Sequence, residues 1–126
     1  MTAPAIRGIY HADVSADPEL GRHRSRKHCV CVSVGSGLYL LVNTAHRELY
    51  NDFQIKASDY AFLSGVDRFI SCHKPKEIST SSLIQRVGTL SNTDTRTVIA
   101  KIKASRAIPE NDKTVIISEL STTLIK

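Results

Sequence analysis

Two short apolar segments on either side of a glycine-rich turn are the feature that most constrains this fold. The segments 29–34 and 38–42 are made almost entirely of aliphatic, β-branched and small apolar residues, a composition that favours β-strands. Gly35-Ser36-Gly37 stands between them, and a short glycine-containing loop between two extended segments is typical of a β-hairpin. The pattern therefore predicts a pair of antiparallel strands.

Several other segments before residue 90 carry strand or turn signals. Asp17-Pro18 and Gly21 mark a long loop, and Asn51-Asp52 marks a turn. We expect one or two helical turns over residues 81–87, closed by Gly88. Further strands are expected over residues 7–14, 67–73 and 76–79.

The last third of the chain has helical periodicity. Ser91 and Asp94 have the spacing of a capping box, and an apolar stripe follows at Val98, Ile99 and Ile102. Pro109 interrupts the pattern, and it resumes over residues 110–126 with apolar residues at four-residue spacing. We therefore expect two helices after a β-rich part, with the stripe of the first helix buried.

Composition limits the class of protein and its partners. A chain of 126 residues, 41% of them hydrophobic, is sufficient for one folded domain with its own core. The formal net charge is +5, from 17 Lys and Arg against 12 Asp and Glu, which favours a polyanionic partner such as RNA, DNA or an acidic protein. Aromatic residues make up 6% of the chain and none is Trp, which argues against a large base-stacking platform.

The run from Gly21 to His28 concentrates the positive charge. All its residues except Gly21 and Ser25 are Arg, Lys or His, and the run leads directly into the expected strand 29–34. A strand that anchors one end of a cationic loop can present Arg and His to a phosphodiester. The alternative is an ordinary solvated surface loop.

The cysteines and the hydropathy bear on the compartment. Cys29 and Cys31 alternate on an expected strand and so share a face, where buried packing is more common than metal binding. Three cysteines do not suggest a disulfide framework, and no apolar run is long enough to span a bilayer. We expect a cytoplasmic protein with no metal, no cofactor and no membrane contact.

Five segments carry a family resemblance through their order along the chain: residues 7–14, 27–33, 38–44, 62–72 and 83–91. The first, with a basic residue and Gly before Ile9-Tyr10, resembles the opening strand of the PemK/MazF toxin family. Lys27-His28 stands where that family has Arg-Pro, and Thr44 lies in a loop that resembles its threonine-containing loop. The last segment is similar to the family's basic lead into its terminal helix.

This resemblance, which covers roughly residues 6–104, implies a mainly β fold, a small SH3-like antiparallel barrel of the PemK/MazF type with a helix after it. Together with the chain length and the second helical segment after Pro109, which lies outside the resemblance, it leads us to expect one domain over residues 1–126: the barrel over 6–79, followed by C-terminal helices in a helical part over 81–126. The resemblance also implies a toxin of a toxin-antitoxin system: a metal-independent endoribonuclease that cleaves single-stranded RNA, is neutralised by a cognate antitoxin protein and forms a homodimer.

The resemblance assigns transition-state stabilisation to Arg26 or Lys27 and phosphate binding to Thr44. Histidine is the side chain that most often transfers protons near neutral pH, and the candidates for this role are His28, His46 and His11. Further RNA contacts are expected from the cations Arg22, Arg24, Arg26, Lys74 and Arg86.

Two alternatives stay open at this point. Because Lys27-His28 replaces Arg-Pro, the chain could be a catalytically inactive barrel that binds protein or nucleic acid. The other alternative is an enzyme with a nucleophilic cysteine next to a histidine, as at Cys72-His73. However, neighbouring residues on a strand point to opposite faces, which opposes a direct pairing of this thiol and imidazole.

Overall fold

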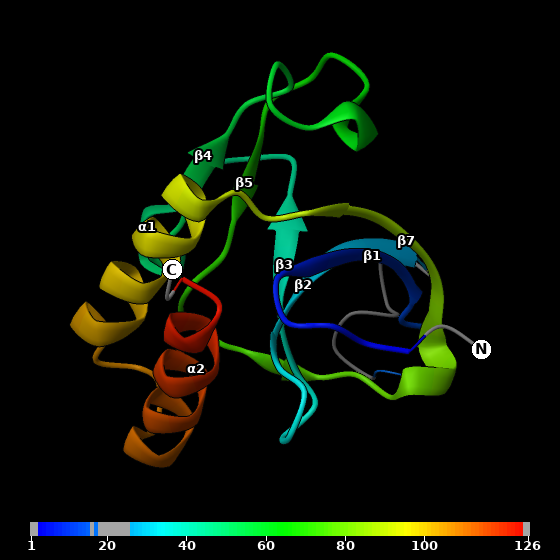
Figure 1. Cartoon of the computed structure of the whole chain (residues 1–126). Helices are drawn as coiled ribbons and strands as arrows, with labels where there is room; N and C mark the ends of the chain where they lie inside the picture. Colours follow the sequence, from blue (N-terminus) through cyan, green and yellow to red (C-terminus); the bar gives the residue numbers. More distant parts are fainter. Residues whose placement is uncertain (1–2, 16, 18–25, 125–126) are drawn as a thin grey trace.

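The computed structural model describes residues 3–15, 17 and 26–124. An antiparallel sheet is followed by two helices that lie together beside it (Figure 1). In the described residues the strands are β1 (Gly8–Asp13), β2 (Arg26–Ser33), β3 (Leu38–Asn43), β4 (Phe53–Ile55), β5 (Arg68–Ile70), β6 (Lys76–Glu77) and β7 (Leu83–Thr89). The helices are α1 (Asn92–Ala104) and α2 (Glu110–Thr122), with short 3-10 turns at η1 (Glu48–Tyr50), η2 (Ala61–Leu63) and η3 (Thr80–Ser82).

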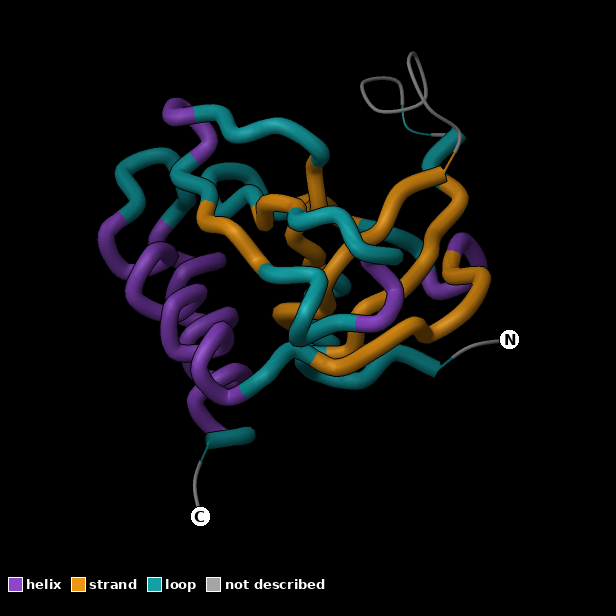
Figure 2. The backbone as a smooth tube through the Cα atoms, turned by 90° about the horizontal axis from the view of Figure 1, so that it is seen from above, coloured by secondary structure: helices purple, strands orange, loops and turns teal. Residues whose placement is uncertain are grey.

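The strands form one strongly bent sheet. Their order is β4-β5-β3-β2-β1-β7, β6 pairs with β3, and every pairing is antiparallel. Seen from above, the sheet curls on one side of the molecule and the helices occupy the other (Figure 2). Within the described residues the sheet is barrel-like but not closed. The predicted fold class, a small antiparallel β structure followed by C-terminal helices, is confirmed.

The hairpin predicted at Gly35-Ser36-Gly37 connects β2 and β3. Gly37 has a φ of +64°, a left-handed conformation that glycine adopts without strain, and its N–H donates to the carbonyl of Val34 at 3.3 Å. Cys29 pairs with Leu41 further along the two strands. The sequence prediction of this strand pair is therefore confirmed.

Residues 81–87 do not form the predicted helical turns. Residues 83–89 form β7, which pairs with β1. The pairing has a register shift between Ile9 and Tyr10, as at a β-bulge. Leu83, Ile84 and Val87 have a helix-like spacing. However, the edge of β1 that does not pair with β2 offers this segment a ladder of backbone hydrogen bonds. The helical part of the chain therefore begins at α1 and not at residue 81.

The start of β2 and the presence of β4 also differ from the sequence prediction. β2 begins at Arg26 and not at Cys29, because the end of β1 continues the pairing along Ala12–Lys27 and Asp13–Arg26. Part of the cationic run is therefore a strand. The sequence analysis also missed β4, which pairs with β5 close to the predicted Asn51-Asp52 turn.

The core has two parts, one on each face of β2. Val30 and Val32 pack in a cluster with the buried side chains of both helices, while Cys29 and Cys31 pack on the opposite face in a second cluster. All four residues are fully buried. A strand that is apolar on both faces belongs in the interior of a sheet, which fixes β2 as the central element.

The two helices cover the larger cluster. The Ser91 hydroxyl accepts from the N–H of Asp94 at 3.1 Å, which confirms the predicted cap of α1. Val98 and Ile102 are fully buried, and Ile99 is half-buried against the same cluster. Across the described residues, no helix has both the length and the apolar character that crossing a membrane requires.

Candidate functional site: a basic pocket beside the β2–β3 hairpin

A cavity of about 450 Å³ opens at the end of the hairpin that is remote from its glycine turn. Because β2 and β3 are antiparallel, the cationic start of β2 lies beside the end of β3, and the loop after β3 closes the same corner. Arg68 on β5 completes the wall. We name this cavity the basic pocket, and its lining residues are His11, Arg26, Lys27, His28, Val42, Asn43, Thr44, Ala45, Arg47, Tyr50 and Arg68.

The charge of the basic pocket is of one sign. Four of the described side chains that line it are Lys or Arg, two more are His, and no carboxylate is among these described residues. A concave site with charges of one sign concentrates counter-ions more strongly than an open surface does. The composition of the basic pocket therefore suits an anion, and three of its cations are guanidinium groups, which can bind phosphate through two hydrogen bonds.

His11 and His28 face each other in this pocket. They are directly paired across β1 and β2, and their ring centroids lie 5.1 Å apart with the planes inclined by 34°. The ring of Phe62 lies 4.9 Å from His28 on another side. Burial lowers the pKa of His28, and the positive potential of His11 and Arg68 lowers it further. His28 is therefore neutral at pH 7, the form that accepts a proton.

Lys27 and Thr44 meet at the junction of β2 with the end of β3. The Nζ of Lys27 donates to the Oδ1 of Asn43 at 2.6 Å, so the ammonium is held beside the last residue of β3. Thr44 follows immediately, is exposed and lines the pocket. Its hydroxyl is available to donate to a bound anion.

A buried carboxylate shapes the loop that carries Arg47. One oxygen of Asp52 lies 2.6 Å from the Nδ1 of His46, and the other accepts from the backbone N–H of Arg47 at 2.8 Å. The side chain of Asp52 is fully buried, whereas that of His46 is 57% exposed. His46 is absent from the lining of the basic pocket, so its contact with Asp52 positions the loop.

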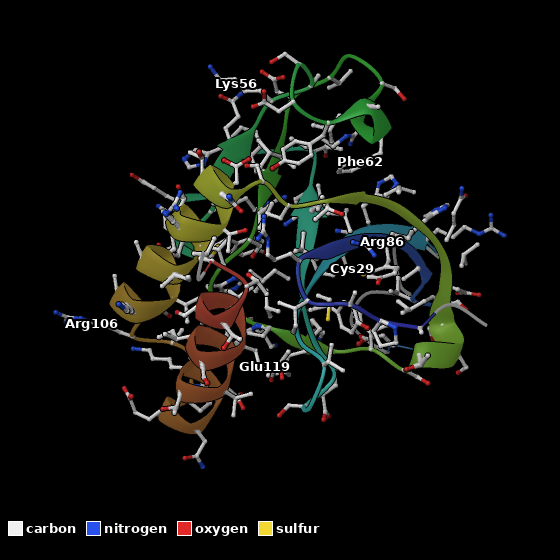
Figure 3. The ribbon with its side chains drawn as sticks, viewed as in Figure 1. Cys29, Lys56, Phe62, Arg86, Arg106 and Glu119 are labelled. Atoms are coloured by element: carbon white, nitrogen blue, oxygen red, sulfur yellow. The ribbon has the colours of Figure 1, made fainter. Side chains whose placement is uncertain are left out.

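The structure brings Arg26, Lys27, His28 and Thr44 together, but it does not add every predicted residue to them. Lys74 lines a different cavity that also includes Ser36, at the turn end of the hairpin. Arg86 lies on β7, where its guanidinium donates to the hydroxyl of Thr89 at 2.7 Å (Figure 3). The expected RNA contacts Arg22 and Arg24 lie outside the described residues.

The sequence analysis missed four polar members of the pocket: Asn43, Arg47, Tyr50 and Arg68. The Tyr50 ring stacks on His73 with centroids 4.3 Å apart, and the guanidinium of Arg47 lies 5.7 Å from the centre of the same ring. A correct pairing of the predicted strand 67–73 with the end of β3 would have identified Arg68, because Asn43 pairs with Phe69.

The cysteines lack the character of nucleophiles. All three are free and buried. Burial raises the pKa of Cys29 to about 12, that of Cys31 to about 11 and that of Cys72 to about 12. At neutral pH these groups are thiols, and the thiolate is the reactive form. The observations therefore oppose the alternative of a cysteine enzyme.

Comparisons with known proteins do not assign a family to this chain. No family model matches the chain, and no curated protein is significantly similar to it. The resemblance to the PemK/MazF family therefore remains a hypothesis based on the order of short motifs. The charge and the side-chain chemistry of the basic pocket are the main indications of function.

Proposed function

We propose that the chain is a toxin-like endoribonuclease that cleaves single-stranded RNA in the basic pocket without a metal ion. The observation that carries this proposal is the composition of the pocket: four permanent cations and a facing pair of imidazoles, with no carboxylate among the described lining residues. Cleavage of RNA by its own 2′-hydroxyl needs a base, an acid and a cation for the charge on phosphorus. The lining of the pocket includes all three.

Binding places the scissile phosphate among the cations. Arg26 is our first choice for the charge that develops on the phosphorane, because a guanidinium contacts two oxygens at once. Lys27, held by Asn43, adds a point charge. Thr44 donates a hydrogen bond to a phosphate oxygen, and Arg47 and Arg68 strengthen the positive potential.

The chemical step needs one neutral and one protonated imidazole. His28, neutral because of its lowered pKa, takes the proton of the 2′-hydroxyl as that oxygen attacks phosphorus. The bond from phosphorus to the 5′-oxygen breaks, and protonated His11 gives its proton to this leaving oxygen. The products are a 2′,3′-cyclic phosphate and a 5′-hydroxyl. At a ring separation of 5.1 Å, repulsion disfavours two protonated rings, which fits one base and one acid.

The same proposal includes the partners that the resemblance implies. A cognate antitoxin would neutralise the enzyme in the cytoplasm, and an acidic antitoxin segment would complement the basic pocket by charge. A homodimer is the expected assembly.

A binding module is the second candidate, and one contact favours it. Lys27, which stands at the Arg-Pro position of the family, donates to Asn43 and cannot supply the two-pronged contact of an arginine. A pocket of this kind can retain RNA phosphates without cleaving them.

The test is incubation of the protein with single-stranded RNA in the presence and in the absence of EDTA, followed by analysis of the new ends. We expect cleavage in both samples, with 2′,3′-cyclic phosphate ends. Absence of cleavage in both samples, together with RNA binding that weakens as salt rises, would replace the enzyme by the binding module.

A further inference from the structure

A second cationic cavity, also of about 450 Å³, runs along α1. We name it the α1 groove. Arg96 and Lys101 supply its charge, no carboxylate is among the lining residues that the structure describes, and Ala100 and Ala104 contribute small side chains to the lining. Arg96 is exposed and Lys101 is half-buried. The complete lining is Asn51, Arg96, Thr97, Ala100, Lys101 and Ala104.

The basic pocket and the α1 groove are lined by consecutive residues of one turn. Tyr50 lines the basic pocket, and the next residue, Asn51, lines the α1 groove. The side-chain amide of Asn51 donates to the carbonyl of Lys101 at 2.9 Å, so the end of η1 is fastened to α1. Figure 1 shows this short turn directly behind α1. One turn, fastened to α1, therefore contributes a lining residue to each cavity.

The carboxylates of the neighbouring segments are not among the described residues that line the α1 groove. Asp94 on α1 accepts from the hydroxyl of Tyr60 at 2.5 Å. Asp52 is occupied by His46 and by the backbone of Arg47. Glu48 on η1 is exposed but lines neither cavity. Lys101 and Arg96 are therefore the charged side chains among the described residues that line the α1 groove.

We infer that the α1 groove binds the phosphates of nucleotides that flank the cleaved one, so that the substrate is an extended single strand and not a dinucleotide. This inference rests on the proposed function of the basic pocket. Between the two cavities, Tyr50 is stacked on His73, and Arg47 lies over its ring. Recognition along the groove therefore depends on phosphate charge more than on base stacking, and tolerates different sequences.

The test compares two strand lengths bound to the full chain. The probes are 2′-O-methyl RNAs of about four and about twelve nucleotides, within the usual range of single-strand sites, and they cannot be cleaved through a 2′-hydroxyl. The variant is Arg96→Gln/Lys101→Gln. The matched control is Lys56→Gln/Arg106→Gln, which removes two exposed cations that lie outside both cavities (Figure 3).

We expect the wild type and the control to bind the long probe more tightly than the short one. The groove variant should lose that advantage, keep its affinity for the short probe, and show a salt slope lower by about 1.4 for the long probe, the value for two phosphate contacts on a single strand. An unchanged length advantage, or equal losses for both probes, would overturn the groove alone. If the wild type binds neither probe at low salt, the proposed function fails as well.

Discussion

The imidazoles of His11 and His28 face each other across the β1–β2 pair, with ring centroids 5.1 Å apart. Phe62 lies against His28. Among the described residues, four Lys and Arg side chains line the same pocket as this histidine pair. Each positive charge in this group makes the next one harder to add. The pair therefore gives the pocket a response to pH that a simple cationic patch lacks.

The first prediction concerns the pH dependence of stability. The pKa of His28 is lowered from 6.5 in the folded chain, so the unfolded chain binds more protons as the pH falls through 6.5. Its contribution to stability is fully present above pH 6.5 and decreases from there down to the folded pKa. Urea unfolding at several pH values should show this slope in the wild type and a smaller slope in His28→Gln. An equal slope in both would contradict the lowered pKa.

The second prediction concerns the contact between α2 and the hairpin. The carboxylate of Glu119 accepts from the Ser33 hydroxyl and from the N–H of Val34 at 2.9 Å, and it points at the hairpin from α2 (Figure 3). Glu119→Ala should lower the free energy of unfolding by about 1.5–3 kcal/mol, the range for hydrogen bonds to a charged group.

The matched control for this contact is Glu110→Ala. Glu110 is on the same helix, but its side chain is 86% exposed and lies 3.6 Å from Lys113 in a surface ion pair. Such a pair contributes about 0–1 kcal/mol. Equal unfolding midpoints for the two variants in denaturant would mean that Glu119 does not fasten α2 to the sheet.

The third prediction concerns the packing of α1. Val98 is fully buried beneath the sheet, whereas Ala100 on the same helix is exposed. Val98→Asp should destabilise the chain by about 3–5 kcal/mol, the scale of an uncompensated buried charge. Ala100→Asp should change the free energy of unfolding by less than about 1 kcal/mol. Thermal or urea unfolding measures both, and a small effect at Val98 would refute the placement of α1.

The sequence was sufficient for elements whose signals are local. The turn at Gly35–Gly37 and the Ser91 cap depend on neighbouring residues, and both were predicted correctly. β7 was not, because only Leu83 of its seven residues is buried, so the apolar alternation of a half-buried strand is missing. Its strand conformation comes from β1, which is distant in the chain.

The candidate site follows the same rule. Arg26, Lys27, His28 and Thr44 were proposed from the family resemblance together with the cationic run before one predicted strand and Thr44 after the next. Arg47 and Arg68 could not be proposed, because their positions depend on the buried carboxylate Asp52 and on the pairing of β5 with β3. β3 and β5 are separated by more than twenty residues in the chain, so their pairing cannot be seen in the sequence of either strand. The burial of Asp52 likewise depends on the folded structure.

The fourth prediction concerns the thiols. Because Cys29, Cys31 and Cys72 are buried with raised pKa values, alkylation by iodoacetamide at pH 8 should be very slow in the folded protein and rapid in urea. Mass spectrometry after timed quenching gives the rate for each cysteine. Fast modification of Cys72 under native conditions would reopen the alternative of a cysteine nucleophile.

The central claim is that the basic pocket cleaves RNA, and the most direct measurement is the cleavage rate of single-stranded RNA in EDTA by matched variants. Arg26→Ala and Thr44→Ala should each lower the rate by about 10²–10³ while the thermal unfolding profile is retained, because each removes a preorganised donor to the transition state. Arg106→Ala, which removes an exposed arginine outside the pocket, should cleave at the wild-type rate. Full activity of both folded pocket variants would contradict the assignment.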